Sequence, residues 1–207
     1  MTHWTIPTVT AILMLVLHLS NNFVVETLRL KSFDLLQTQD EYVLSKDIGI
    51  VTIDEASLEK YGQWPWSRAF ISDIIWQLRE AGAGIIVLPM LFSEDDRLGG
   101  DSYLQDALTD NGVVIAQTGS IGVNKNAVPR GVAMIGDPLP WLFEWPGMLG
   151  PIPKLGTVAD GVGVINTAPE IDGVVRRVPL IVKVGTETYP NLAVEVIRVA
   201  TGKPSYQ

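Results

Sequence analysis

Residues 47–68 read DIGIVTIDEASLEKYGQWPWSR, and this stretch decides the fold that we expect. The run from Ile48 to Ile53 is rich in β-branched apolar residues, which predicts a buried strand that stops at Asp54. In open α/β sheets the carboxyl ends of the strands border the ligand crevice. Asp54 and Ser57 are therefore candidate ligand-binding residues.

A Trp-Pro-Trp motif at residues 64–66 follows a turn at Gly62 and directly precedes a helix. Proline fixes φ, and two tryptophans supply more aromatic surface than a connector needs. The motif indicates either the wall of a binding site or a hydrophobic plug beneath the turn. Trp66 and Arg68 join the candidate ligand-binding residues.

Helix and strand patterns alternate after this stretch. Ser67 is placed to cap a helix that runs to Gly82, residues 83–88 and 113–117 predict two further strands, and Asp101 is placed to cap the helix between them. This β-α-β-α-β order predicts an α/β fold with a three-layer-like parallel core and right-handed crossovers.

The second half of the chain predicts an antiparallel extension of that core. Residues 161–166 and 174–184 read as strands on either side of an Asp172-Gly173 turn, which is a hairpin signal. A helix is expected to follow at residues 189–200.

Residues 137–153 are too rich in proline for a regular element and predict an aromatic loop. Its large side chains are Trp141, Phe143 and Trp145. Such a loop is expected to cap a pocket, to contact the membrane or a partner subunit, or to cover the edge of a sheet.

The first 25 residues contain no Asp, Glu, Lys or Arg. The mostly apolar run from Trp4 to Val25 is close to the roughly 20 residues that cross a bilayer, so a transmembrane span is predicted at residues 1–25. A secretory signal and a buried helix are the alternatives. The basic residues near the span do not fix its orientation.

The remainder is expected to form two parts, a juxtamembrane helix with its connector at residues 26–46 and a globular domain at residues 47–207. The helix carries an apolar stripe that either pairs with a copy of itself or packs on its own domain. Its members are Val25, Leu28, Leu35 and Leu36.

The composition excludes many kinds of activity. A formal net charge of -8 opposes binding to a nucleic-acid backbone, and the absence of cysteine excludes disulfides and thiolate chemistry. Both histidines, His3 and His18, precede the globular domain, so that domain cannot build a Ser-His-Asp triad or a histidine zinc site. No dinucleotide or phosphate loop is present, so we expect neither a cofactor nor a metal.

Arg176 and Arg177 are adjacent, so on a strand at most one of them faces inward. An inward Arg176 would either pair with Asp54 or Asp172 or hold an anionic ligand. Asp172, Arg176 and Asn166 complete the set of candidate ligand-binding residues.

Six motifs together resemble one family of sensory domains. They are IDEASL at 53–58, GQWPWSR at 62–68, LPMLFSEDD at 88–96, GVGVIN at 161–166, DGVVRRVPL at 172–180 and YPNLA at 189–193. In order and spacing they resemble the CHASE type 2 domain, a cyclase- and histidine-kinase-associated sensory extracellular module. One departure is Pro89, at a strand end where the family usually carries an aspartate.

The resemblance implies a periplasmic or extracellular α/β sensor, held at the cell inner membrane and attached to a cyclase, a histidine kinase or a Ser/Thr kinase. Positions that match the family pattern are Asp54, Ser57, Trp64, Trp66, Arg68, Asp172 and Arg176. We expect a homodimeric input domain for an unidentified ligand, without catalytic residues of its own. The alternatives are a protein-interaction scaffold that uses the aromatic loop and a carboxylate-dependent hydrolase.

Overall fold

A computed structural model of the chain describes residues 4–19, 23–39, 45–130, 136–167 and 169–205. The described residues form a mixed α/β structure with two sheets. Contacts divide the chain into two compact units, one made of Met1–Thr52 with Pro169–Arg176 and the other of Ile53–Ala168 with Arg177–Gln207.

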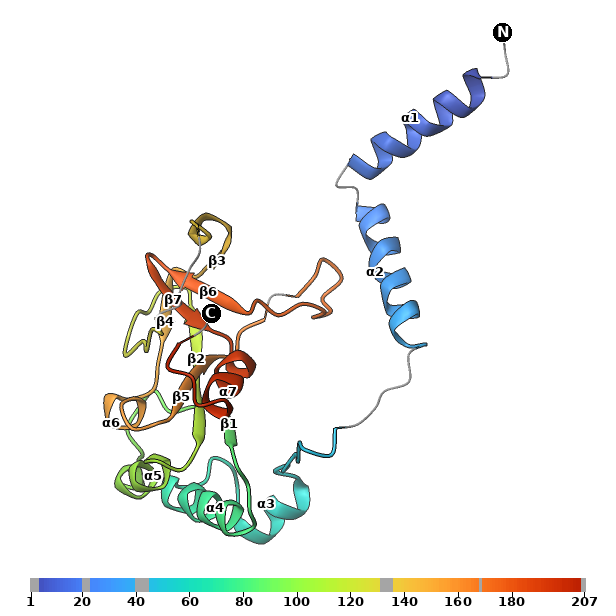
Figure 1. Cartoon of the computed structure of the whole chain (residues 1–207). Coiled ribbons are helices and arrows are strands. Elements are labelled where there is room, and N and C mark those ends of the chain that lie inside the picture. Colours follow the sequence, from blue (N-terminus) through green and yellow to red (C-terminus); the bar gives the residue numbers. More distant parts are fainter. Residues whose placement is uncertain (1–3, 20–22, 40–44, 131–135, 168, 206–207) are drawn as a thin grey trace. The chain divides into compact units, whose positions relative to one another are not determined.

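The larger unit, residues 53–168 with 177–207, is built on a sheet with a parallel centre (Figure 1). Strand β2 (Val113–Ser120) lies between β1 (Ile86–Leu91) and β5 (Gly161–Val164), and all three are parallel. The end of β2 also pairs antiparallel with β4 (Gly147–Leu149).

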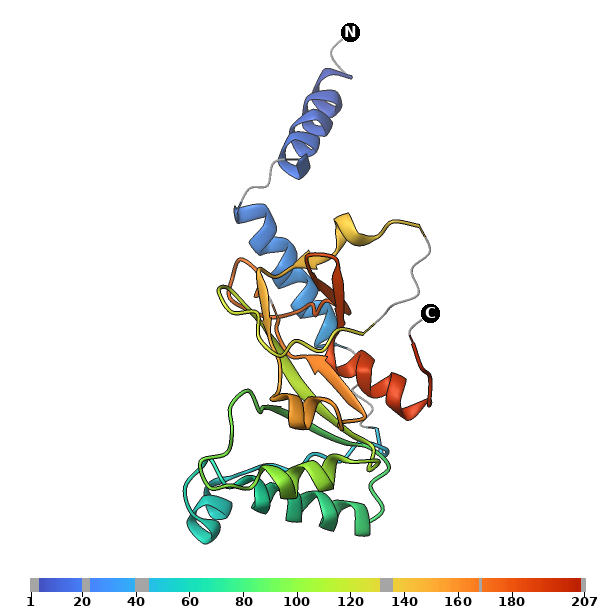
Figure 2. The same cartoon turned by 90° about the vertical axis from the view of Figure 1, so that its left-hand side faces the viewer.

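Helices cover one face of this sheet with the main hydrophobic core. Helix α3 (Glu55–Tyr61) leads into α4 (Arg68–Glu80), which lies beside α5 (Asp101–Leu108), and α6 (Pro153–Gly156) follows (Figure 2). The core joins these helices to alternate residues of the strands, which is the pattern expected for one face of a pleated sheet. Its fully buried members include Ile75, Leu104, Leu108, Val113, Ile115, Leu155 and Val162.

Helix α7 (Leu192–Ala200) packs against β5 and β2. Two glycines of β5 permit this close approach, because a Cβ on Gly163 would lie 2.4 Å from Leu192 Cα and one on Gly161 would lie 2.7 Å from Glu195 Cγ. The helices of the core and α7 therefore lie on opposite faces of the sheet, and the mixed α/β class that the sequence predicts is confirmed.

A second, smaller sheet joins β3 (Phe143–Glu144), β6 (Ile181–Val184) and β7 (Glu187–Pro190). The predicted aromatic loop supplies β3, β4 and a short 3-10 turn, η1 (Leu139–Trp141). Trp145 of this loop packs directly over Gly119 of β2, where a Cβ would lie 2.4 Å from the indole, and Phe143 meets Trp145 edge-on. Trp141, in contrast, is 89% exposed.

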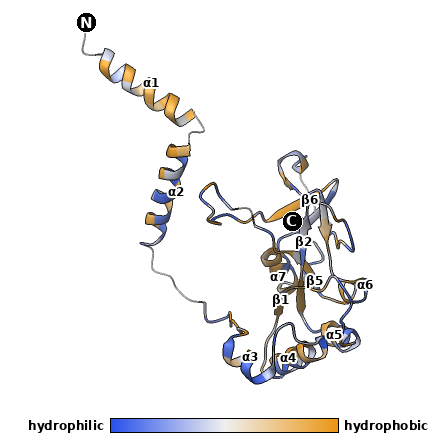
Figure 3. Ribbon diagram, turned by 180° about the vertical axis from the view of Figure 1, so that it is seen from behind, coloured by the Kyte–Doolittle hydropathy of each residue, from blue (hydrophilic) through white to orange (hydrophobic). Residues whose placement is uncertain are grey.

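The smaller unit contains α1 (Thr5–Leu19) and α2 (Phe23–Gln37), and α2 overlaps both the predicted span and the segment expected to form the juxtamembrane helix. Helix α1 is coloured mostly as hydrophobic in Figure 3. Across the described parts of the chain, no helix is both long enough and apolar enough to cross a membrane. Residues 1–3 and 20–22 of the predicted span, and residues 40–44 of the predicted connector, lie outside the described residues.

The predicted first strand at residues 48–53 is wrong. These residues form no strand, and Ile48, Ile50 and Val51 are exposed. A β-branched run becomes a strand only when a neighbour supplies its ladder hydrogen bonds, and no described residue pairs with this segment. The third parallel strand is instead β5.

Two other strand predictions need correction. The strand expected at 83–88 begins three residues later, as β1, and the predicted hairpin around Asp172-Gly173 does not form. Only 181–184 of the predicted 174–184 strand is regular, and it pairs with β7 across the turn at Gly185. The turn at Asp172-Gly173 does exist, but irregular chain enters and leaves it.

Candidate functional site

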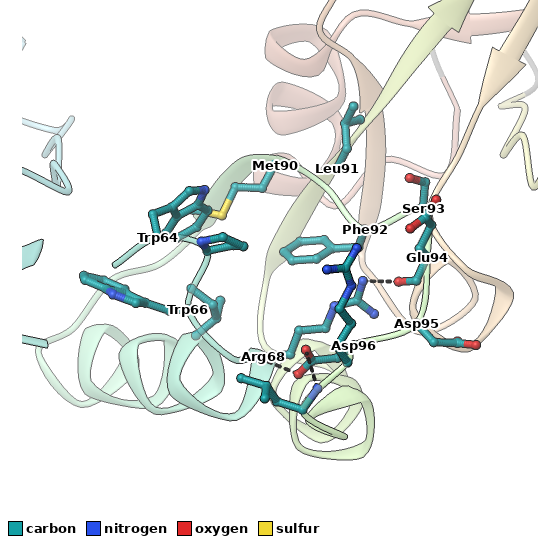
Figure 4. A pocket seen from close by; sticks show the side chains of 14 residues that line it. Trp64, Trp66, Arg68, Met90, Leu91, Phe92, Ser93, Glu94, Asp95 and Asp96 are labelled. Atoms are coloured by element: carbon teal, nitrogen blue, oxygen red, sulfur yellow. Dashed lines mark hydrogen bonds between the residues drawn. The ribbon is translucent and has the colours of Figure 1, made fainter. Parts of the chain in front are cut away.

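A pocket of about 540 Å³ opens at the carboxyl end of β1, within the larger unit (Figure 4). Residues 64–66, Arg68 and Ile71 line it from the start of α4, and residues 90–98 line it from the segment that follows β1. This is the edge of a parallel sheet at which α/β proteins bind ligands. Its volume lies within the roughly 300 to 1,000 Å³ of typical ligand pockets.

The apolar side of the pocket is a cluster of aromatic rings fixed by mutual contact. The ring of Trp66 meets those of Trp64 at 5.9 Å, Phe70 at 5.0 Å and Tyr61 at 5.9 Å, each edge to face. Trp66 also donates from Nε1 to the carbonyl of Gly62 at 2.8 Å. Trp66 is therefore held by its neighbours, whereas Trp64 remains 44% exposed beside Met90 (Figure 4).

The polar floor of the pocket is centred on Arg68. Its guanidinium donates to a carboxylate oxygen of Asp101 and to the carbonyl of Glu94, and it lies 5.2 Å from the ring centre of Phe92. The side chains of Arg68 and Asp101 are only 11% and 16% exposed. The base of the pocket is therefore an arginine whose charge is neutralised by a mostly buried ion pair.

Asp96 connects the start of α4 with the loop that follows β1. Its carboxylate accepts from the backbone N–H groups of Arg68 at 3.0 Å, Gly100 at 3.0 Å and Leu98 at 3.2 Å. Burial opposes ionisation of this group, but these donors outweigh it and lower the pKa of Asp96. Asp96 is thus part of the scaffold, and no group of metal-ligating side chains occurs among the residues that the structure describes.

A second candidate element is a clamp on α2, within the smaller unit. Arg176 donates to both oxygens of Asp34 at 2.6 and 2.8 Å and to both oxygens of Asp172 at 2.8 and 2.7 Å. Lys31 Nζ lies 3.9 Å from Asp172. Because Asp34 and Lys31 belong to α2, this clamp fastens the helix to the turn at residues 169–176.

The contacts of the clamp determine how its stability depends on pH. The Arg176 guanidinium lowers the pKa of Asp172 strongly and that of Asp34 in the same direction, and the two carboxylates raise the pKa of Arg176. A carboxyl whose folded pKa lies below its unfolded value stabilises the fold above the unfolded value of 3.8. That stabilisation is lost as the pH falls through the lowered folded pKa.

We expect carbon NMR of the carboxyl groups to show both Asp34 and Asp172 titrating below 3.8 in the wild-type chain. In Arg176→Ala the two midpoints should rise, because the guanidinium that favours the ionised forms is gone. The clamp should thus hold from neutral pH down to about pH 4. Midpoints that are the same in both proteins would contradict the clamp.

The seven candidate residues from the sequence fall into four separate groups. Trp66 and Arg68 line the pocket, and Asp172 and Arg176 form the clamp. Asp54 caps α3 by accepting from the backbone N–H of Ser57 at 2.9 Å and from its hydroxyl at 2.6 Å, and these bonds lower the pKa of Asp54. Of the two partners considered for Arg176, the structure shows Asp172 and not Asp54, and Asp34 is an additional partner that the sequence did not indicate.

Asn166 and Pro89 lie apart from the pocket lining. Asn166 accepts from the Thr118 hydroxyl at 2.9 Å and from the backbone N–H of Gly119, so it joins the ends of β5 and β2. Pro89 is exposed on β1 and directly precedes the pocket residue Met90. The departure from the family pattern at Pro89 therefore falls outside the described lining of the pocket.

Comparison with known families gives one match. A family model described as the CHASE2 domain matches residues 9–207, so the match includes both the pocket and the clamp. Comparisons with curated proteins and with solved structures gave no match.

Proposed function

The chain belongs to the CHASE2 domain family, whose members are sensory extracellular modules of cyclase and kinase receptors, and from this premise we propose that it is a ligand-sensing input domain. The proposed receptor carries a cyclase or kinase effector elsewhere in its sequence. In this proposal the pocket at the end of β1 receives the ligand, and α2 passes the signal on.

The N-terminus is proposed to hold the globular domain at the membrane. This part of the proposal is supported by the sequence, because residues 1–25 carry no Asp, Glu, Lys or Arg and the mostly apolar run from Trp4 to Val25 is close to the length of a span. The globular domain then lies on the periplasmic or extracellular side, as the family implies.

The clamp is the single observation that carries the signalling role. Helix α2 is the described element that follows the proposed tether, and Arg176 fixes it through four hydrogen bonds to Asp34 and Asp172. The contact between Arg176 and the two carboxylates can be closed or open. A ligand that binds one of these states more tightly increases the fraction of molecules in that state, and with it the fraction in which α2 is held or released.

Chemical labelling in intact cells tests the proposed location. The chain lacks cysteine, so Ile121→Cys, at a position 85% exposed in the larger unit, introduces a single thiol. We expect a membrane-impermeant maleimide to label this variant without lysis. The control is Ala107→Cys, at a fully buried position, which should stay unlabelled until the protein is denatured. Labelling of the Ile121 variant only after lysis would refute an extracytoplasmic domain.

The proposed receptor acts as a homodimer through the free side of α2. Leu28, Leu35 and Leu36 are each more than 60% exposed on this helix, while Leu30 is buried. An apolar stripe of this kind is suited to packing against the same stripe of a second copy.

One observation favours the second candidate function, a protein-interaction module. Trp141 is 89% exposed on η1, and exposed tryptophans are enriched at sites of protein contact. If this candidate holds, Trp141→Ala abolishes partner binding and Trp64→Ala, in the pocket, leaves it unchanged.

A further inference from the structure

The pocket carries an inference about the chemistry of its ligand, which rests on the proposed sensory function. We propose that the pocket binds a neutral, hydroxyl-rich ring with one apolar face, such as the pyranose ring of a sugar. Three properties of the pocket support this class of ligand: a fixed aromatic wall, a floor whose charges are already paired, and a rim that offers both donors and acceptors.

The wall provides a flat apolar surface. Trp64 is 44% exposed, and its edge-to-face contact with Trp66 fixes the position of its ring. Met90 lies beside it and adds a polarisable thioether (Figure 4). The negative face of an aromatic ring attracts the slightly positive C–H groups that a pyranose presents on one side.

The floor of the pocket disfavours a charged ligand, because its own charged groups already have partners. The guanidinium of Arg68 is occupied by Asp101, by the carbonyl of Glu94 and by the ring of Phe92. Both carboxylate oxygens of Asp96 are occupied by backbone donors. A charged ligand would displace these partners, whereas a neutral ligand leaves them in place.

The rim supplies polar groups of both kinds. Ser93, Glu94, Asp95 and Arg97 line the pocket, and the last three are exposed. The hydroxyl groups of a ligand can donate hydrogen bonds to the carboxylates of Glu94 and Asp95 and accept hydrogen bonds from the guanidinium of Arg97. Such charge-assisted hydrogen bonds are stronger than those between neutral groups. A polyhydroxylated ring can use donors and acceptors together, which a simple amine or a simple acid cannot do.

The experiment is titration of the complete chain with neutral pyranoses, namely glucose, galactose, N-acetylglucosamine and cellobiose, followed by calorimetry. Mannitol, which is hydroxylated but has no ring, phenethylamine and benzoate serve as comparison ligands. We expect at least one pyranose to bind, with a dissociation constant about tenfold higher in Trp64→Ala and a smaller increase in Glu94→Gln. Trp141→Ala, which removes an exposed tryptophan outside the pocket lining, should bind as the wild type does.

The possible results distinguish failure of the neutral-ring ligand from failure of the proposed sensory function. Binding of only phenethylamine or benzoate, weakened in Trp64→Ala, overturns the neutral ring but keeps the pocket as a ligand site. Equal binding of a pyranose to wild type and Trp64→Ala overturns the pocket as its site. Absence of binding by every pyranose overturns the ligand class, while the sensory role is judged independently by the effect of the clamp on output.

Discussion

Arg176→Ala is expected to release α2 and to abolish the transmission of a ligand signal. The substitution removes all four hydrogen bonds that join Asp34 and Asp172, and it leaves the two carboxylates close together with only Lys31 nearby as a cation, 3.9 Å from Asp172. Amide hydrogen exchange of residues 23–37 should become roughly tenfold faster, because a helix outside a packed core depends on such fixed contacts. In the receptor, effector output should no longer respond to ligand.

Arg29→Ala is the matched control for this prediction. Arg29 is an arginine of the same helix, but it pairs with Glu26 on the exposed surface of α2, and exposed pairs of this kind contribute little. Exchange in α2 and effector output should therefore stay near the wild-type values. Near-ultraviolet circular dichroism should show the core of the larger unit unchanged in both variants. Unchanged exchange in Arg176→Ala, or loss of the core signal, would contradict a clamp that acts on α2 alone.

Asp101→Ala is expected to destabilise the larger unit by about 3 kcal/mol, because it leaves the mostly buried Arg68 without its counter-ion. The substitution also removes the acceptor for the backbone N–H of Asp96, which Asp101 binds at 3.1 Å. The loop that lines the pocket then loses one of its two attachments to the start of α5, and binding in the pocket should be weakened as well.

Asp95→Ala provides the comparison for Asp101→Ala, since Asp95 is an exposed carboxylate of the acidic run at residues 94–96. Its removal should change the free energy of unfolding by less than about 0.5 kcal/mol. Denaturant unfolding, followed by circular dichroism, measures both variants. Equal stability of the two would show that the Arg68–Asp101 pair does not support the pocket.

The helices were predictable because their signals are local. Ser67 caps α4 by accepting from the backbone N–H of Phe70, three residues away, and the apolar spacing of this helix matches the face that it buries. The prediction of a strand at 48–53 failed for the opposite reason. Its apolar residues are suited to a strand, but strand formation depends on a partner that no local pattern reveals.

The two candidate sites were predictable only in part, because each joins distant segments. Asp34 and Arg176 are 142 residues apart, so nothing near either residue in the sequence indicated the clamp. The pocket similarly joins the Trp-Pro-Trp motif to the acidic run at residues 94–96, which lies far from it in the sequence. The motifs of the family identified the individual residues, and the tertiary structure alone showed which of them act together.

The carboxylate of Asp96 has a mechanical consequence. Because it holds the backbone N–H groups of Leu98 and Gly100 in its own loop and that of Arg68, the first residue of α4, the rim of the pocket cannot move independently without breaking bonds at the start of that helix. Entry of a ligand would therefore move the rim and the start of α4 together, because one carboxylate joins them.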